Sequence, residues 1–155
     1  GSEEAFVNMM NRRAQELMAN GTHFMNPHGL HDDNHYTTAY DLYLIFNECI
    51  KHEDFVNIIQ SEAYTAYYTD VDGNSQEVLF TPTNLYAQGE VDVPENVTIV
   101  GGKTGTTDEA GYCLILMEKD SSDNPYISIV MGASEKPVLY EDMTSLIEAI
   151  PSGQQ

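Results

Sequence analysis

The chain has 155 residues, which is the size of one domain, and 41% of them are hydrophobic against 20% charged. This composition is typical of a globular protein and excludes a disordered one. Six Lys and Arg residues against 25 Asp and Glu residues give a formal net charge of −19 at pH 7, so the surface repels phosphate groups and non-specific binding to nucleic acid is excluded.

About residues 1–62 are predicted to form a helical region. Ser2 is a favourable N-cap and Asn20-Gly21 is a stop signal, so the first helix is expected over about residues 3–20. One face of this helix has mainly apolar residues at helical spacing. These residues are Phe6, Met9, Met10, Arg13 and Leu17.

A polar loop over residues 22–37 separates the first helix from the second. Thr38 followed by Asp41 resembles a capping box, and the second helix is expected to continue to about Ile50. A short third helix is predicted over about residues 53–60.

The pattern over about residues 63–90 is irregular and includes one hairpin. Two β-prone segments, 63–69 and 76–81, flank Asp72-Gly73, a dipeptide typical of tight hairpin turns. Three tyrosines in this part are expected to pack within a strand rather than to form a ligand platform. They are Tyr64, Tyr67 and Tyr68.

About residues 97–150 predict a sheet and a covering helix. Three short β-branched runs, 97–107, 111–119 and 126–133, are expected to form an antiparallel meander. The final helix is expected over 136–150. Its inward face would comprise Leu139, Met143, Leu146, Ile147 and Ile150. Helices first and a helix-covered antiparallel sheet last predict an α+β fold, with residues 1–155 as a single domain.

Metal and redox chemistry are not expected. Cys49 and Cys113 lie in apolar segments and are predicted to be buried free thiols. Three histidines lie in the Pro- and Gly-containing loop, where no regular spacing of ligands is expected, so no metal site and no cofactor are predicted. These histidines are His28, His31 and His35. Asp70-x-Asp72-x-Asn74 imitates a calcium loop, but Ser75 and Thr81 stand where that loop needs Gly and Glu, so a hairpin turn is predicted instead.

The segment around Lys103-Thr104-Gly105 is the strongest candidate for chemistry. Lys103 is one of six basic residues and lies in a predicted strand flanked by glycines. A cation, a hydroxyl and a free backbone N–H on one strand edge can bind a carboxylate and an oxyanion, and a neighbouring glycine permits a ligand to approach the backbone. The tripeptide alone is also compatible with a surface lysine beside a Gly-rich turn.

Several separated segments, in the same order, resemble the D-alanyl-D-alanine carboxypeptidase family of low-molecular-mass penicillin-binding proteins. K-T-G is one of the three signatures of penicillin-recognising serine enzymes. The segments that carry the resemblance are T-H-F-M-N-P-H-G-L at 22–30, H-Y-T-T-A-Y-D-L at 35–42, Thr83-Asn84-Leu85, and G-K-T-G-T-T-D-E-A-G-Y-C-L at 102–114. The resemblance implies part of the β-lactamase/transpeptidase fold and, for the family, removal of the terminal D-Ala from peptidoglycan stem peptides through an acyl-enzyme.

The resemblance also implies roles for the residues that match the third motif. Lys103 would supply positive potential, Thr104 would hydrogen-bond the substrate carboxylate, and Gly105 would let the substrate backbone pair beside the strand. The backbone N–H of Thr106 would be an oxyanion donor, and Thr107 is a further candidate for substrate binding. The partners implied are a stem peptide ending in D-Ala-D-Ala and, for the complete enzyme, β-lactam antibiotics.

The chain departs from the family pattern in its nucleophile. None of its nine serines has Lys three residues later, so the S-x-x-K motif is missing, and the chain is expected to be inactive alone because no acyl-enzyme can form. Ser122-Asp123-Asn124 spells one form of the second motif, S-x-N, but it follows K-T-G and is predicted to be an ordinary turn between two strands.

The chain is therefore expected to be the C-terminal part of a catalytic domain. A non-catalytic pseudoenzyme, or a module that binds cell-wall peptide, is the alternative. No apolar run reaches the roughly 18 residues of a membrane helix and the acidic start does not fit a signal peptide, whereas the family implies an extracytoplasmic, cell-envelope location. A sheet edge and apolar surface left open predict a homodimer that covers them.

Overall fold

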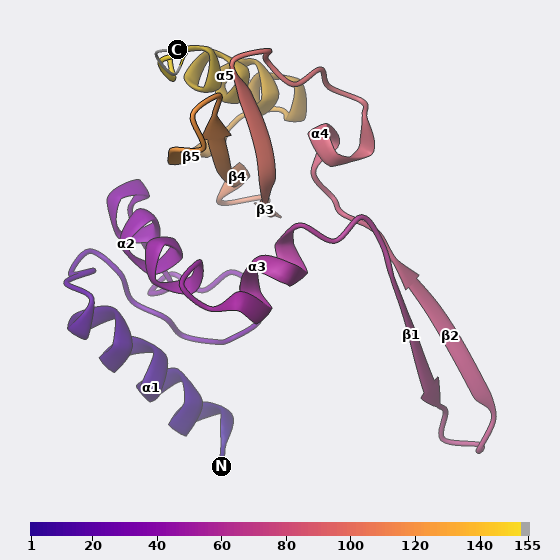
Figure 1. Cartoon of the computed structure of the whole chain (residues 1–155). Helices are drawn as coiled ribbons and strands as arrows, with labels where there is room; N and C mark the ends of the chain where they lie inside the picture. Colours follow the sequence, from indigo (N-terminus) through magenta and orange to yellow (C-terminus); the bar gives the residue numbers. More distant parts are fainter. Residues whose placement is uncertain (153–155) are drawn as a thin grey trace.

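The computed structural model describes residues 1–152 and shows helices and antiparallel strands in the predicted order, with one additional short helix at residues 85–88 where an irregular stretch was expected (Figure 1). The helices and strands are α1 (Glu3–Glu16), α2 (Ala39–Cys49), α3 (Glu53–Ile59), β1 (Tyr64–Thr69), β2 (Ser75–Phe80), α4 (Leu85–Gln88), β3 (Val97–Thr107), β4 (Gly111–Asp120), β5 (Pro125–Ala133) and α5 (Lys136–Glu148). The three-stranded sheet has the order β3-β4-β5 and β1 pairs with β2 in a separate hairpin. No helix among these is long and apolar enough to cross a bilayer.

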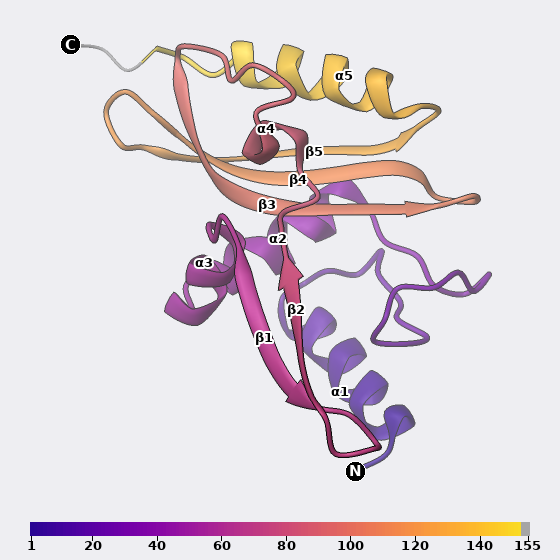
Figure 2. The same cartoon turned by 90° about the vertical axis from the view of Figure 1, so that its right-hand side faces the viewer.

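The sheet lies between two helical layers. Helix α5 packs on one face against β4 and β5, while α2 contacts β5 and α3 contacts β3 from the other side (Figure 2). Helix α1 lies beyond α2, away from the sheet (Figure 1). The strand that carries Lys103 therefore has the helical region on one face and α4 and α5 on the other.

The predicted helix starts are correct, but the predicted end of α1 is wrong. The side chain of Ser2 accepts a hydrogen bond from the N–H of Ala5, as an N-cap does. The helix then ends at Glu16 rather than Asn20, because Met18 adopts a left-handed conformation with φ of 64°. The N–H of Ala19 donates to the carbonyl of Ala14, which completes the hydrogen-bond pattern of a Schellman cap.

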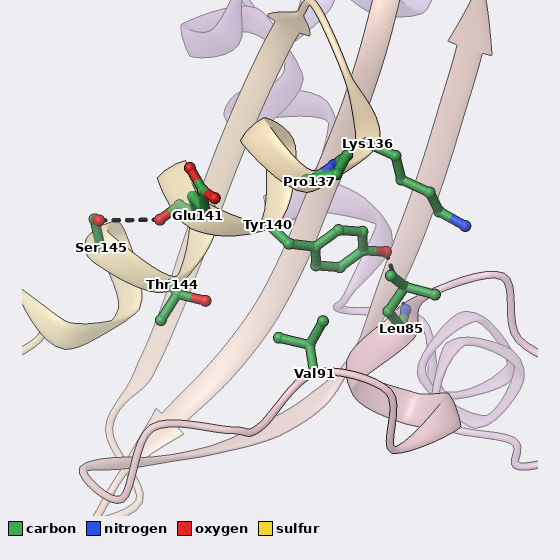
Figure 3. A pocket seen from close by; sticks show the side chains of 8 residues that line it. All are labelled: Leu85, Val91, Lys136, Pro137, Tyr140, Glu141, Thr144 and Ser145. Atoms are coloured by element: carbon green, nitrogen blue, oxygen red, sulfur yellow. Dashed lines mark hydrogen bonds between the residues drawn. The ribbon is translucent and has the colours of Figure 1, made fainter.

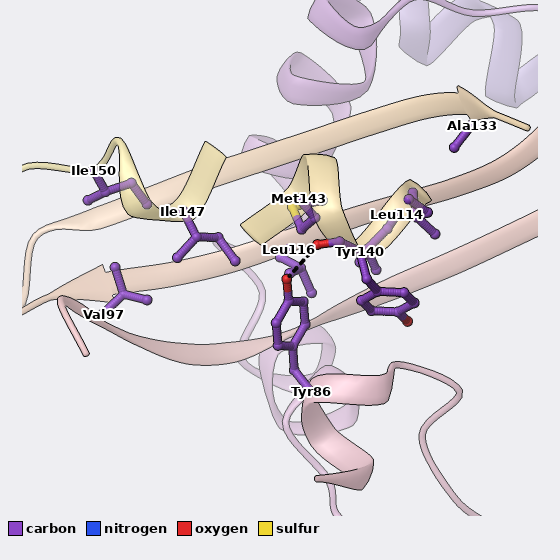
Figure 4. Close-up of a cluster of buried hydrophobic side chains, with 10 residues drawn as sticks. Tyr86, Val97, Leu114, Leu116, Ala133, Tyr140, Met143, Ile147 and Ile150 are labelled. Carbon is purple, nitrogen blue, oxygen red and sulfur yellow. Dashed lines mark hydrogen bonds between the residues drawn. The ribbon is translucent and has the colours of Figure 1, made fainter. Parts of the chain in front are cut away.

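The main core lies between the sheet and α5 (Figure 4). Leu114 and Leu116 of β4 are buried against Met143 and Ile147 of α5, as the helix pattern predicts. Leu146 is an exception to that prediction, because it lies on the outer side of α5 and is 45% exposed. The hydrophobic contacts of this layer fix β4 as the central strand of the sheet.

One charged residue shares this core. Glu118 is fully buried on the same face of β4 as Leu114 and Leu116, where the sequence showed no partner for it. Neither of its carboxyl oxygens has a hydrogen-bond partner of good geometry among the described residues. Burial raises the pKa of Glu118 to about 8, and the nearby Ser128 hydroxyl opposes that shift only in part.

The apolar stripe of α1 is at the surface. Phe6 is 52% exposed and Met9 is 56% exposed, whereas the buried residues of α1 are Val7 and Ala14. The stripe forms one wall of an apolar groove of about 310 Å³ whose other wall includes Ile45 of α2. The helical period correctly predicts that these residues share one face of α1. Which of them are buried depends on how α1 packs against its neighbours.

The β1–β2 hairpin projects away from the rest of the chain (Figures 1 and 2). The expectation that its tyrosines pack within the strand is wrong, since Tyr64, Tyr67 and Tyr68 are 52–77% exposed. A two-stranded sheet has no second layer over it unless another element packs there. The predicted turn is correct: the Asp70 side chain accepts hydrogen bonds from the backbone N–H groups of Asp72 and Asn74. A hydrogen bond from the Gln76 amide, together with these backbone bonds, holds the pKa of Asp70 below its ordinary value.

Both cysteines are free thiols, as predicted, but they are only half-buried. Cys49 lies at the end of α2, where burial raises the pKa of its thiol. Cys113 pairs with Gly105 across β3 and β4, and its Sγ lies 3.6 Å from the carbonyl oxygen of Ala110. Its position beside the K-T-G segment makes it part of the surroundings of the candidate site.

Candidate active site

The Lys-Thr-Gly segment lies on an edge strand. Strand β3 pairs with β4 on one side, and within residues 1–152 no strand pairs with its other side. Alternate backbone N–H and C=O groups of an edge strand point away from the sheet and can pair with an extended ligand. The edge of β3 can therefore receive a peptide backbone.

The two sides of β3 have different neighbours. In the register, Lys103 lies opposite Ile115 and Thr104 lies opposite Leu114. Because side chains alternate along a strand and Leu114 is buried under α5, Thr104 and Thr106 lie on the α5 side. Lys103 and Gly105 lie on the side of the helical region.

Lys103 is an exposed cation without an acidic partner in the described part of the chain. None of the ion pairs formed within residues 1–152 includes it. Its ammonium group instead donates to the backbone carbonyl of Thr104, its own neighbour. The molecule has a net charge of −19. Because Lys103 forms no ion pair among the described residues, it is a local site of positive potential that can attract an anionic ligand.

Three glycines of β3 have different environments. A Cβ on Gly101 would lie 2.1 Å from the carbonyl oxygen of Ile59 in α3, and one on Gly102 would lie 2.1 Å from that of Ile115. A Cβ on Gly105 would meet nothing within 4 Å. At Gly101 and Gly102 the chain's own backbone occupies the space that a side chain would fill, so a ligand cannot approach there. The open space for a ligand that the sequence predicts beside Lys103 exists at Gly105.

Thr104 has a hydroxyl partner outside the strand. Its Oγ1 lies 2.5 Å from Oγ1 of Thr83, in the segment that leads into α4. That segment is itself held, since the side-chain amide of Gln88 donates to the carbonyl of Pro82 and the N–H of Leu85 donates to the hydroxyl of Tyr140. The contact connects the K-T-G strand to the layer of α4 and α5.

The two threonines after Gly105 lie toward the end of β3. Thr106 is exposed and lies opposite Tyr112 in the register. The Thr107 hydroxyl oxygen accepts a hydrogen bond from the N–H of Ala110, so this side chain stabilises the β3–β4 turn while keeping its own proton free. The structure therefore brings Lys103, Thr104, Gly105 and Thr106 together on one strand edge, with Thr107 as the last residue of the strand.

The S-x-N look-alike lies apart from this edge, whereas the histidine loop approaches the end of it. Ser122, Asp123 and Asn124 form the β4–β5 turn, in which Asp120 accepts two backbone hydrogen bonds, as the sequence predicts. His31 lies 3.9 Å from Glu109, so the loop of residues 22–37 reaches the turn that follows the K-T-G end of β3. Within the described part of the chain, no three His, Cys, Asp or Glu residues are grouped in a way that could hold a metal ion.

A cavity lies away from this edge. It has a volume of about 610 Å³ and lies between α5 and the segment around α4, lined mainly by Leu85, Val91, Pro137 and Tyr140 (Figure 3). Its walls are mainly apolar and include none of the residues from Lys103 to Thr107. Size alone does not identify the reactive site, because the cation, hydroxyl and free strand edge all lie at β3.

Similarity to known proteins decides the family. The family model described as D-alanyl-D-alanine carboxypeptidase matches residues 1–135. The chain belongs to the D-alanyl-D-alanine carboxypeptidase family. It is 32% identical over 150 residues to D-alanyl-D-alanine carboxypeptidase DacF of Bacillus subtilis (strain 168), and 32% identical over 132 residues to DacA of Escherichia coli (strain K12).

This carboxypeptidase-family chain matches only part of its relatives. The similarity covers 96% of the chain and 35% of DacF, and 85% of the chain and 29% of DacA, so the chain spans about a third of their length. The crystal structure of the Streptomyces K15 DD-transpeptidase superposes with a TM-score of 0.81 and 26% sequence identity over 96% of this chain and 56% of that one. These similarities confirm the predicted α+β fold of the β-lactamase/transpeptidase type.

The sequence pattern missed two features that shape the site of this family member. Thr83 was part of the segment similar to the family's N-T-N-x-L, but nothing in the sequence indicated its contact with Thr104. The close approach of Ile59 to Gly101 was also missed, although a glycine inside a strand is a known signal of close backbone contact.

Proposed function

We propose that this chain forms the K-T-G side of the active site of a serine-type D-Ala-D-Ala carboxypeptidase. The edge position of β3 supports the proposal, because it presents an unneutralised lysine, a hydroxyl and a free backbone edge in four consecutive residues, Lys103 to Thr106. The reaction is hydrolytic removal of the terminal D-Ala from a peptidoglycan stem peptide. β-Lactam antibiotics occupy the same cleft in the complete enzyme.

Each residue of the edge has a physical task in this proposal. Lys103 attracts the terminal carboxylate, and the Thr104 hydroxyl donates a hydrogen bond to it. The open space at Gly105 admits the substrate backbone beside β3. The N–H of Thr106 donates to the oxyanion, a type of contact that contributes roughly 3 kcal/mol to transition-state stabilisation in other hydrolases. Thr107 contributes its free hydroxyl proton at the end of the strand.

The chemical step requires a nucleophile from outside this chain. None of the serines precedes a lysine by three residues, so the sequence offers no S-x-x-K group to form the acyl-enzyme. The chain alone is therefore inactive in this proposal and acts together with a segment that carries the first two motifs. The resemblance places such an enzyme outside the cytoplasm, in the cell envelope.

Labelling with a fluorescent penicillin tests this proposal. The chain is labelled alone and after co-expression with the N-terminal part of a family member such as DacF. We expect no covalent label on this chain in either sample, and label on the added segment only when both are present. Replacement of Lys103 by Ala should abolish that label, whereas replacement of Lys119 by Ala should leave it. Label on this chain alone would show that it has its own nucleophile.

A module that binds cell-wall peptide without catalysis is the alternative. The unneutralised Lys103 and the open edge favour it as much as they favour half of an enzyme. The alternative predicts binding of a D-Ala-D-Ala peptide by the chain alone, with no penicillin labelling of either partner after co-expression. Penicillin labelling of the added segment in the co-expressed sample therefore distinguishes an enzyme from a non-catalytic binding module.

A further inference from the structure

We propose that Thr83 is a positioning residue for carboxylate recognition: its hydroxyl orients that of Thr104 toward the ligand. The inference rests on the proposed function for the role of Thr104. Its own evidence is the 2.5 Å contact between the two Oγ1 atoms, which join segments 21 residues apart in the chain.

The donor count of the two hydroxyls decides the direction of the contact. A threonine hydroxyl has one proton to donate and two lone pairs that accept. When Thr104 donates its proton to a carboxylate, it has none left for Thr83, so the 2.5 Å contact survives only if Thr83 donates to Thr104. Donation into Oγ1 of Thr104 polarises its O–H bond and strengthens the hydrogen bond to the anion.

Thr83 is well placed to hold Thr104 because its own segment is anchored at both ends. Gln88 donates to the carbonyl of Pro82 at 2.7 Å, and the hydroxyl of Tyr140 accepts from the N–H of Leu85 at 3.0 Å. Tyr140 is a buried residue of α5, so the rigid core fixes the position of Thr83. The Thr104 side chain is half-buried on its strand, and without this contact its hydroxyl would rotate among the χ1 rotamers.

The chain offers a matched control for this contact. Thr22 and Thr37 form a second pair of threonine hydroxyls, at 2.8 Å, in the loop of the helical region. Replacement of Thr37 by Val removes one hydroxyl from a threonine pair, as replacement of Thr83 by Val does, but leaves β3 untouched. Thr83→Ser keeps the hydroxyl and completes the set.

The experiment uses the full chain in isotope-labelled form. The χ1 rotamer of Thr104 is measured from three-bond couplings without ligand. Affinity is then measured by titration with an acetylated peptide ending in D-Ala-D-Ala and with its C-terminal amide. We expect Thr83→Val to redistribute the Thr104 rotamers and to weaken binding of the carboxylate peptide by about three- to tenfold. Binding of the amide should not change, and Thr83→Ser and Thr37→Val should behave as the unmodified chain.

Two results would overturn the inference. One is a Thr104 rotamer in Thr83→Val that is unchanged from that of the unmodified chain. The other is an equal loss of affinity for the acid and the amide, which would indicate a merely structural role. An unmodified chain that binds neither peptide contradicts the proposed role of this edge in binding, and the rotamer measurement then decides the inference by itself.

Discussion

Gly101 of β3 and Ile59 of α3 are in direct backbone contact: a Cβ on Gly101 would lie 2.1 Å from the carbonyl oxygen of Ile59. The end of α3 therefore packs on the strand that carries the K-T-G segment without any side chain between them. This contact fixes the distance between the helical region and the face of β3 on which Lys103 lies.

Replacement of Gly101 by Ala should separate α3 from β3. We expect the free energy of unfolding to fall by about 2–3 kcal/mol, because the new methyl group meets backbone atoms that cannot rotate away. Gly105→Ala is the matched control and should leave the stability nearly unchanged, since nothing lies within 4 Å of its Cβ position. Urea denaturation of both variants checks this, and equal losses of stability would contradict the packing.

Glu118 should make the stability of the chain depend on pH. Burial raises its pKa from 4.5 to about 8, so the folded chain keeps a proton that the unfolded chain releases above about pH 4.5. The contribution of Glu118 to the free energy of unfolding should be largest below pH 4.5, fall by about 1.4 kcal/mol per pH unit as the pH rises toward 8, and then level off.

The variant Glu118→Gln should remove most of this slope, because it keeps the shape and loses the titrating proton. Glu141→Gln, at an exposed position of α5, serves as the control and should retain the slope. Denaturation at a series of pH values between 4 and 9 measures how the free energy of unfolding changes with pH in each variant. The same slope in Glu118→Gln as in the unmodified chain would mean that other groups dominate the pH dependence.

The two hairpin turns should respond differently to the same substitution. Asp70 and Asp120 make matching contacts, each accepting hydrogen bonds from the backbone N–H groups two and four residues later. Asp120→Ala should lower the thermal midpoint by a few degrees, because β4 and β5 belong to the core. Asp70→Ala should increase amide exchange within β1 and β2 and leave the midpoint unchanged, since that hairpin projects away from the rest of the chain. A global loss of stability in Asp70→Ala would refute its independence.

Lys103 should control the affinity for anionic peptides. We expect Lys103→Met to weaken binding of an acetylated D-Ala-D-Ala peptide by about tenfold or more, since a charge-assisted contact is lost. Lys119→Met is the control, because Lys119 already pairs with Asp123 at 3.3 Å at the other end of the sheet. Nuclear magnetic resonance titration measures both, and equal affinities of the two variants would disprove the role of Lys103.

A homodimer is expected to cover the surfaces that the fold leaves open. These are the free edge of β3 and the apolar groove beside Phe6 and Met9 on α1. Light scattering over a range of protein concentrations should show a mass above 17.3 kDa, and Phe6→Ser should shift the mass toward the monomer if the groove is the contact. A constant monomer mass at high concentration would count against the dimer.

Local patterns predicted the elements well, because short-range forces decide where helices and turns begin. Ser2 and Thr38 cap their helices through hydrogen bonds to N–H groups three residues away, and Asp72-Gly73 lies in the turn of its hairpin. The end of α1 was harder to predict, because Met18 adopts there the left-handed conformation that glycine usually takes. A single sequence gives only a weak indication that a residue other than glycine adopts this conformation at a helix end.

What the sequence by itself determined is the order of elements, the K-T-G strand and the lack of an S-x-x-K serine. Only the tertiary structure decided that β3 is an edge strand within residues 1–152, that Glu118 is buried with no hydrogen-bond partner of good geometry among those residues, and that Thr83 contacts Thr104. Burial and contact depend on which distant segments pack together, and alternation along one strand does not reveal which layer will cover each face. The candidate site is therefore named by its local motif and shaped by neighbours that lie tens of residues away.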